Sequence, residues 1–143
     1  VTIGSLDTRK LSNQARAGKV IIDGIAGDIT VTGTINLDAY LASYDGDLTL
    51  SAGGTIQVAD LDLNLVGTAT FSAGPCTYIN GVLANFNTNN PAASGLIEGN
   101  GGIIYYYPIK NPDLAAGGIH GFYTLSKGTL RARWPRGLVI VFK

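Results

Sequence analysis

The 143-residue chain has no net charge, 20 glycines and only 14% charged residues. This length suits one domain or an excerpt of a longer repeat array. The glycine content and the scarcity of helix formers argue against a helical bundle, and no apolar run is long enough to span a membrane. Because it contains no methionine and no recognisable signal peptide, the chain is expected to be a processed or excerpted product.

Charge is segregated along the chain although the total is zero. Residues 1–19 carry +3, residues 20–109 carry −8 and residues 110–143 carry +5. Segregation of this kind indicates a charged partner, and the partner that we expect is another copy of the same chain.

The first predicted element is a partial coil. The opening Val1–Asp7 resembles a box that recurs at Gly33–Asp38. Lys10–Gly18 is polar and is predicted to be a loop, and the apolar residues after it predict a strand over Gly18–Asp23.

Three near-copies of one pattern follow between Gly27 and Asn80. They begin at Gly27, Gly46 and Gly67, so that their starts lie 19 and then 21 residues apart. A second box follows each copy, and these boxes are Gly33–Ile35, Gly54–Ile56 and a degraded Pro75–Thr77. A period near twenty residues is typical of a solenoid.

Apolar and polar residues alternate within the copies, as in half-buried strands. The apolar residues expected to point inward are Ile29, Val31, Ile35 and Leu37 in the first copy, and Leu48, Leu50, Ile56, Val58, Leu61, Leu63 and Leu65 in the second. Three short strands in each period predict an all-β fold, a three-faced parallel β-helix with about twenty residues per coil. The alternative is an antiparallel sandwich, which would need hairpin turns between strands.

The third copy is less regular. It carries Ala69 and Ala73 at inward positions, so the cross-section is expected to narrow or to be filled by Phe71. The single cysteine, Cys76, cannot form an internal disulfide, and we expect it to be a small buried residue.

The C-terminal region does not keep the period. Residues 1–84 are predicted to form the coils, residues 85–102 an irregular loop, and residues 103–143 a less regular β region that continues or caps them. The strands expected in this region are Ile103–Ile109, which Pro108 ends, then Ile119–Leu125, Thr129–Arg133 and Leu138–Phe142. No amphipathic helix is predicted at either terminus to cap the coils.

The Gly-Asp-Ile/Leu-Thr-Val/Leu-Thr/Ser-Gly and Gly-Thr-Ile boxes resemble the repeats of filamentous haemagglutinin-type exoproteins of bacteria. The resemblance covers roughly residues 1–80. It implies a right-handed β-helix in an exported surface or secreted protein that serves as an adhesin, stalk or carrier. It implies no catalytic residues.

Clustered acids suggest calcium, but the nonapeptide calcium repeat is absent. Asp45 and Asp47 are predicted in a turn, and Asp60 and Asp62 on one face of a strand. We therefore expect these aspartates to face solvent, and no cofactor. Some β-helix enzymes cleave acidic polysaccharides with clustered aspartates, and His120 beside Gly121 faintly resembles part of that machinery. However, residues 20–109 contain no cation to hold an anionic sugar, which indicates that the chain is not an enzyme. The roles of His120 and Cys76 are not assigned by the sequence.

Lys127, Arg131, Arg133 and Arg136 surround Trp134 in a basic segment. Nucleic-acid binding also needs a domain-wide positive field, which a neutral chain with an acidic body lacks. Tyr105, Tyr107 and Trp134 are candidate contacts for a cell-surface glycan, although aromatic residues also serve packing and interfaces.

The sequence thus predicts a non-enzymatic, extracellular or cell-surface structural protein, a building block of a fibre or adhesin that associates with copies of itself through strand edges. Neither nucleic-acid binding nor membrane insertion is expected. The alternatives are a carbohydrate-binding surface module and, more weakly, a fragment of a polysaccharide-degrading enzyme. The residues expected at the subunit interface, where residues 127–143 would dock on residues 20–109 of a neighbour, are Arg131, Arg133, Leu138, Val139, Ile140, Val141 and Phe142.

Overall fold

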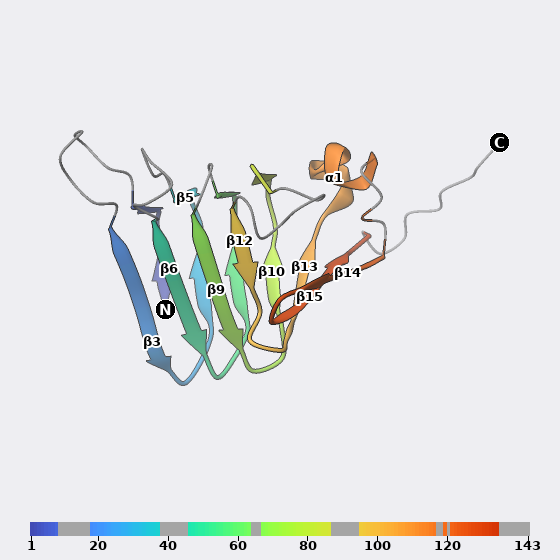
Figure 1. The fold of residues 1–143 in the computed structure, drawn as a ribbon. Coiled ribbons are helices and arrows are strands. Elements are labelled where there is room, and N and C mark those ends of the chain that lie inside the picture. The colour runs from blue at the N-terminus through green and yellow to red at the C-terminus, as the bar shows by residue number, and fades with distance from the viewer. Residues whose placement is uncertain are drawn as a thin grey trace.

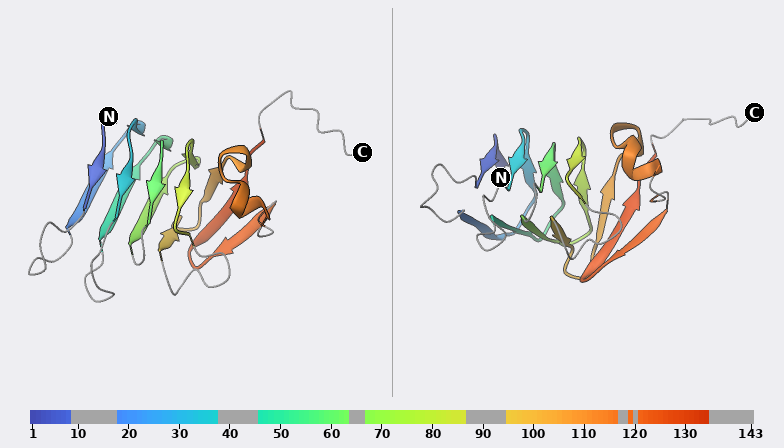
Figure 2. Two further views of the ribbon diagram at one scale, coloured as in Figure 1. Left: turned by 90° about the horizontal axis from the view of Figure 1, so that it is seen from above. Right: turned by 45° about the horizontal axis from the view of Figure 1, so that its top comes forward.

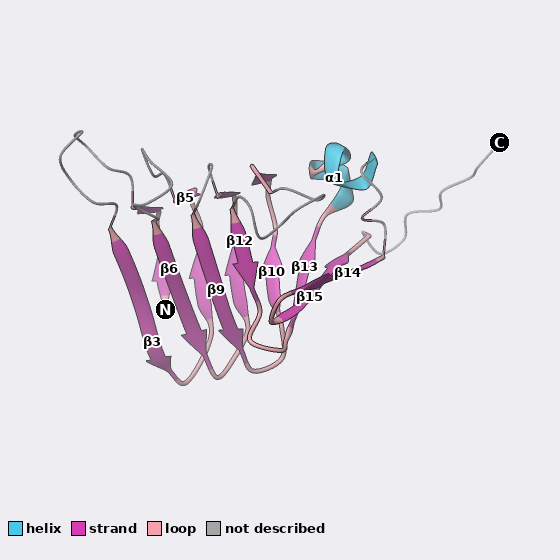
Figure 3. Ribbon diagram, viewed as in Figure 1, coloured by secondary structure: helices cyan, strands magenta, loops and turns pink. Residues whose placement is uncertain are grey.

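The computed structural model describes residues 1–8, 18–37, 46–63, 67–86, 95–116, 119 and 121–134. This part of the chain is mostly β, with parallel sheets, as Figures 1 and 3 show. Sheet A contains β1 (Thr2–Ile3), β4 (Ile29–Val31), β7 (Ile56–Val58), β10 (Thr77–Ile79), β13 (Ile103–Tyr106), β15 (Gly128–Ala132) and β14 (Phe122–Leu125), in that spatial order. Sheet B contains β2 (Leu6–Asp7), β5 (Ile35–Asn36), β8 (Leu61–Asp62) and β11 (Leu83–Ala84). Sheet C contains β3 (Lys19–Ile25), β6 (Asp47–Ala52), β9 (Thr68–Ala73) and β12 (Leu96–Glu98).

From β3 onward, successive strands enter sheets C, A and B in a constant order through β11. Each strand from β3 to β10 pairs in parallel with the strand that follows one round later, so that β3 pairs with β6, β4 with β7 and β5 with β8. Figure 2 shows the resulting rows of strands side by side. Antiparallel pairing occurs within the described residues only between β14 and β15, whereas a sandwich would use it throughout.

The number of residues per round varies. Lys19 pairs with Asp47, 28 residues later, and Asp47 pairs with Thr68, 21 residues later. The additional residues lie in the connections from a sheet B strand to the next sheet C strand. The connection from β8 to β9 includes residues 64–66, whereas the connections from β2 to β3 and from β5 to β6 include the longer ranges 9–17 and 38–45. The spacing of 21 residues between the second and third copies is therefore confirmed, whereas the spacing of 19 residues between the first and second copies is wrong as the length of one round.

The cause is a misaligned first copy. Strand β4, which follows Gly27, pairs with β7 of sheet A and not with β6 of sheet C. The residues that pair with Asp47–Leu50 are Lys19–Ile22. A glycine followed by alternating apolar residues recurs before strands of different sheets, so the local pattern does not reveal which sheet a strand joins.

The apolar residues of the alternating pattern form one continuous core. Because successive side chains of a strand point to opposite faces, one face of each strand points inward. The predicted inward residues from Ile29 to Leu63 are at most 2% exposed, and Ala69 and Phe71 are fully buried. The predicted inward direction of these residues is confirmed, and Leu65 lies outside the described residues.

The C-terminal region differs from the prediction in two ways. Strand β12 lies inside the stretch predicted to be an irregular loop, and it pairs with β9 in parallel. Strand β13 ends at Tyr106, two residues before Pro108, and a 3-10 helix η1 (Pro108–Lys110) and a helix α1 (Pro112–Ala116) follow it. Both helices are too short to produce a helical periodicity in sequence. Leu114 of α1 is only 7% exposed, so this helix helps to close the core, contrary to the expectation that no helix caps the coils. No helix in the described residues is long and apolar enough to cross a membrane.

Tyr106 fills the core at the same end of the molecule. Its side chain is fully buried, and its hydroxyl donates a hydrogen bond to the carbonyl oxygen of Ile119. Burial raises the pKa of the Tyr106 phenol, because the anion is poorly solvated there.

We expect Tyr106→Phe to lower the free energy of unfolding by about 1–3 kcal/mol, because a buried carbonyl loses its donor. The raised pKa also means that the unfolded chain releases its phenol proton before the folded chain does. Wild-type stability should thus be fully present below the ordinary tyrosine pKa and fall as pH rises above it. Denaturant melts at neutral and alkaline pH check both points. A Tyr106→Phe variant that loses stability with alkaline pH as steeply as the wild type would contradict the assignment to Tyr106.

Candidate functional site

Three acidic side chains of the described residues, those of Asp28, Asp60 and Asp62, form hydrogen bonds between neighbouring rounds of the chain. Asp28 Oδ1 accepts a hydrogen bond from the Thr55 backbone at 2.7 Å. Asp60 Oδ1 accepts one from Val82 N, also at 2.7 Å, and the carboxylate of Asp62 accepts one from Asn85 Nδ2 at 2.6 Å. Within the described ranges, no group of three or more His, Cys, Asp or Glu side chains is placed to hold a metal ion.

An aromatic and arginine column runs along the outer face of sheet A. Backbone pairing aligns Tyr78 with Tyr105, Tyr105 with Arg131, and Arg131 with Phe122. The rings of Tyr78 and Tyr105 stack with centroids 5.4 Å apart and planes inclined by 18°. Aromatic pairs in such offset stacks contribute stability beyond the area that they bury.

Both predicted arginines cover aromatic rings. The Arg131 guanidinium carbon lies 4.3 Å from the ring centroid of Phe122. The Arg133 guanidinium carbon lies 4.4 Å from the ring centroid of Tyr78 and 5.9 Å from that of Tyr107. These distances are typical of cation–π contacts.

The structure therefore brings together four of the residues selected from the sequence, Tyr105, Tyr107, Arg131 and Arg133. Trp134 is 43% exposed at the end of the described chain. The apolar run Leu138–Phe142 and His120 lie outside the described residues. Tyr78 and Phe122 were not predicted from the sequence, because their place in the column depends on strand register. For Tyr78, the available signal was its alignment with Gln57, which follows the preceding Gly-Thr-Ile box as Tyr78 follows Pro75–Thr77.

The expectation that Cys76 is a small buried residue is wrong, because Cys76 is half-exposed. Its hydrogen bond with Tyr78 is the main cause that raises the pKa of the Tyr78 phenol, followed by burial and by the charge of Cys76. The positive charge of Arg133 acts in the opposite direction. Since the net effect is a raised pKa, Tyr78 is a neutral ring at physiological pH, and Arg133 contacts its π-face without an ion pair.

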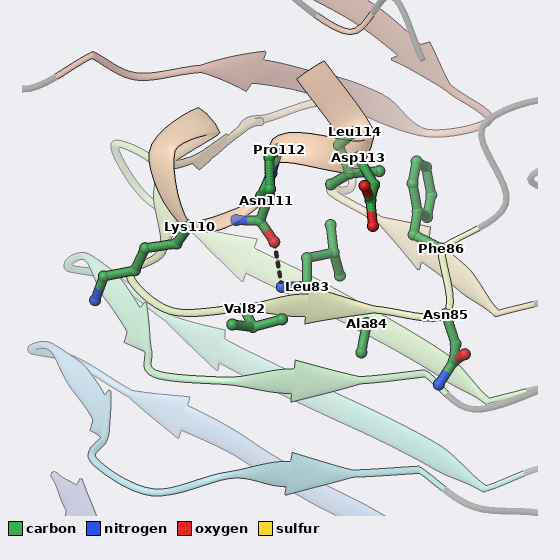
Figure 4. A pocket seen from close by; sticks show the side chains of 10 residues that line it. All are labelled: Val82, Leu83, Ala84, Asn85, Phe86, Lys110, Asn111, Pro112, Asp113 and Leu114. Carbon is green, nitrogen blue, oxygen red and sulfur yellow. Dashed lines mark hydrogen bonds between the residues drawn. The ribbon is translucent and has the colours of Figure 1, made fainter. Parts of the chain in front are cut away.

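A groove of about 460 Å³ lies beside β11, the last strand of sheet B, as Figure 4 shows. Asn111 lines this groove and is 4% exposed. Its Oδ1 accepts a hydrogen bond from Leu83 N at 2.7 Å, and its Nδ2 donates to the carbonyl oxygens of Gly81 and Tyr107 at 3.1 and 2.8 Å. The Asn111 amide thus takes the place of a further strand at this edge.

A second groove of about 370 Å³ adjoins the aromatic column, lined by Asn80, Tyr107, Ile109 and Lys110. It combines one aromatic ring, one exposed aliphatic side chain and one amine. Lys110 also lines the groove beside β11, where Asp113 is the acidic group. These surfaces offer stacking, hydrogen bonding and charge to a ligand.

Comparison of the chain with protein-family models, with curated proteins and with solved structures finds no match.

Proposed function

We propose that this chain is a structural protein without catalytic activity, a three-sided, right-handed parallel β-helix that serves as a building block of an extracellular or cell-surface fibre or adhesin. Copies of the chain associate with one another through strand edges. The resemblance of its glycine boxes to haemagglutinin-type exoproteins supports the extracellular location.

The order of strands supports the solenoid. Strands from β3 to β11 join sheets C, A and B in turn, and each strand from β3 to β10 pairs in parallel with its successor one round later. Crossovers between parallel strands are right-handed in about 98% of cases, which supports the handedness. One apolar core common to all rounds, as solenoids require, supports the stacking of the coils.

The observation that best supports the structural role is that polar side chains form hydrogen bonds between neighbouring rounds. Asp28, Asp60 and Asp62 bond groups 22 to 27 residues away in sequence, each in the following round. Catalytic carboxylates must instead converge on a substrate. Carboxylates that each join two neighbouring rounds favour a structural role over an active site.

Binding of a cell-surface glycan through Tyr105, Tyr107 and Trp134 is a second candidate. The half-exposed rings of the aromatic column and the adjoining groove favour it. The contacts that Tyr78 makes with Tyr105 and with Arg133 occupy ring surface that a sugar would need, and this favours the structural role.

Light scattering and electron microscopy of the purified protein test the proposal, and we expect high-molecular-weight species or filaments. Removing Leu138–Lys143, or reversing Arg131 and Arg133 to glutamate, should leave a folded protein that no longer assembles into filaments, because the basic C-terminal segment is proposed to dock on the acidic residues 20–109 of a neighbour. A protein that stays monomeric and binds a glycan array would favour the second candidate. Release of reducing ends from a polysaccharide would overturn the absence of catalysis.

A further inference from the structure

The two ends of the stack differ in how well the core is covered. At the C-terminal end, Leu125 of β14 and Leu130 of β15 are at most 4% exposed, and α1 lies over the same end (Figure 1). At the N-terminal end, the core-facing Val20, Ile22 and Ile25 of β3 are only partly buried. Ile21 of the same strand is 58% exposed. Among the described residues, the apolar end that is less covered is therefore the one that β3 borders.

Strand β3 has one free edge among the described strands. It is the last strand of sheet C and pairs with β6 on its other side. Asp47 N of β6 donates to Gly18 O at 3.3 Å, so the carbonyl of Gly18 points toward β6 and the N–H of Lys19 points away from it. In a parallel ladder these groups alternate in direction. The N–H and C=O groups of Lys19, Ile21 and Asp23 consequently point to the free edge.

We propose that β3 is the edge through which two copies of this chain join, with β3 of one copy antiparallel to β3 of the other about a two-fold axis at Ile21. This inference rests on the proposed self-association and specifies its partner as a second copy. Ile21 then faces Ile21 of the second copy, and Lys19 faces Asp23 of the second copy on both sides of the axis. The three edge residues of each strand would exchange both of their backbone hydrogen bonds with the other strand.

Charge and shape in β3 select this register. Lys19 and Asp23 are placed symmetrically about Ile21 and carry opposite charges, so a two-fold axis pairs unlike charges twice. On the core-facing side the same register sets Val20 against Ile22 of the second copy, which extends the core across the junction. The pairing is self-complementary, as a two-fold interface requires.

A β-bulge limits the edge to these residues. The register with β6 shifts between Ile22 and Ile25, and Gly24 lies in the left-handed region with φ 72°. Gly24 N donates to Asp23 Oδ1 at 2.7 Å, which leaves the other carboxylate oxygen for Lys19 of the second copy. Bulges and charges usually block edge pairing. In β3 the bulge and the charges leave one five-residue segment, centred on Ile21, that can pair in antiparallel with the same segment of a second copy.

Cross-linking tests the geometry. In a Cys76→Ser background, we compare Ile21→Cys with Ile109→Cys, because wild-type Ile21 and Ile109 are 58% and 57% exposed. A two-fold pair at position 21 brings the two Cα atoms to about 5.5 Å, within the range that a disulfide spans. Under mild oxidation at low protein concentration, Ile21→Cys should form a covalent dimer and Ile109→Cys should stay monomeric. Equal dimer yields from the two variants would overturn the proposal.

A charge exchange tests the register by sedimentation. Lys19→Asp and Asp23→Lys each place like charges opposite one another, and each should weaken the homodimer about tenfold. A mixture of the two variants restores unlike pairs and should form a heterodimer as tight as the wild-type dimer. If the wild type associates but neither variant nor the mixture changes its dissociation constant, β3 is not the edge, although self-association stands. If the wild type is monomeric at every concentration, the proposed self-association fails together with this edge.

Discussion

Leu50→Ala is expected to lower the free energy of unfolding by about 2–5 kcal/mol, as other buried leucine-to-alanine changes do. Leu50 is fully buried in β6, and its neighbours in register are Ile22 of β3 and Phe71 of β9. Truncation would remove apolar contacts and leave a cavity between adjacent rounds, which the flanking backbone ladders resist closing. Urea or guanidinium melts followed by circular dichroism measure the loss.

Asp47→Ala in the same strand is the matched control. Asp47 is only half-buried, and the hydrogen bond that it donates to Gly18 uses its backbone, which alanine keeps. We expect a change within about 0.5 kcal/mol for this surface substitution. Equal losses for Leu50→Ala and Asp47→Ala would show that the alternation in β6 does not define inside and outside.

Asn111→Ala is expected to cost roughly 2–4 kcal/mol, because buried polar groups that lose their partner carry their full desolvation penalty. Without the side-chain amide, the N–H of Leu83 and the carbonyl oxygen of Gly81 lose their partner at the edge of sheet B. The tyrosine that precedes η1, Tyr107, also loses a donor to its carbonyl oxygen. The loss should therefore destabilise the closed end of the stack, and denaturant melts would register it.

Asn80→Ala provides the comparison for Asn111. The Asn80 amide donates to Gln57 Oε1 at 3.4 Å on the exposed face, so its loss should change stability by less than about 0.5 kcal/mol. Asn111→Asp keeps an acceptor for Leu83 N and loses both amide donors, and it should fall between the two. An Asn111→Ala variant as stable as Asn80→Ala would mean that β11 does not need the amide at its edge.

The sequence by itself determined the direction of the side chains. Ile29, Leu48 and Ile56 are buried as predicted, because alternation with period two follows from the pleat of a single strand and needs no distant partner. The parallel sheets could be anticipated for a related reason, since each round alone has one apolar row that only another round can cover. Pro108 likewise indicated where β13 ends, two residues before it, because proline lacks the N–H that a ladder requires.

The tertiary structure alone decided which strands pair and what surrounds them. Strand β4 joins sheet A because β3 already occupies the sheet C position of the same round. The glycine box before β4 does not reveal this, because similar boxes occur before strands of more than one sheet. Tyr78 meets Tyr105, and Arg133 meets Tyr78, only once that register is set across more than twenty residues. The free edge of β3 is also a property of the assembled sheet. A strand's own residues establish which face is apolar, whereas its neighbours in space establish which backbone groups remain unpaired.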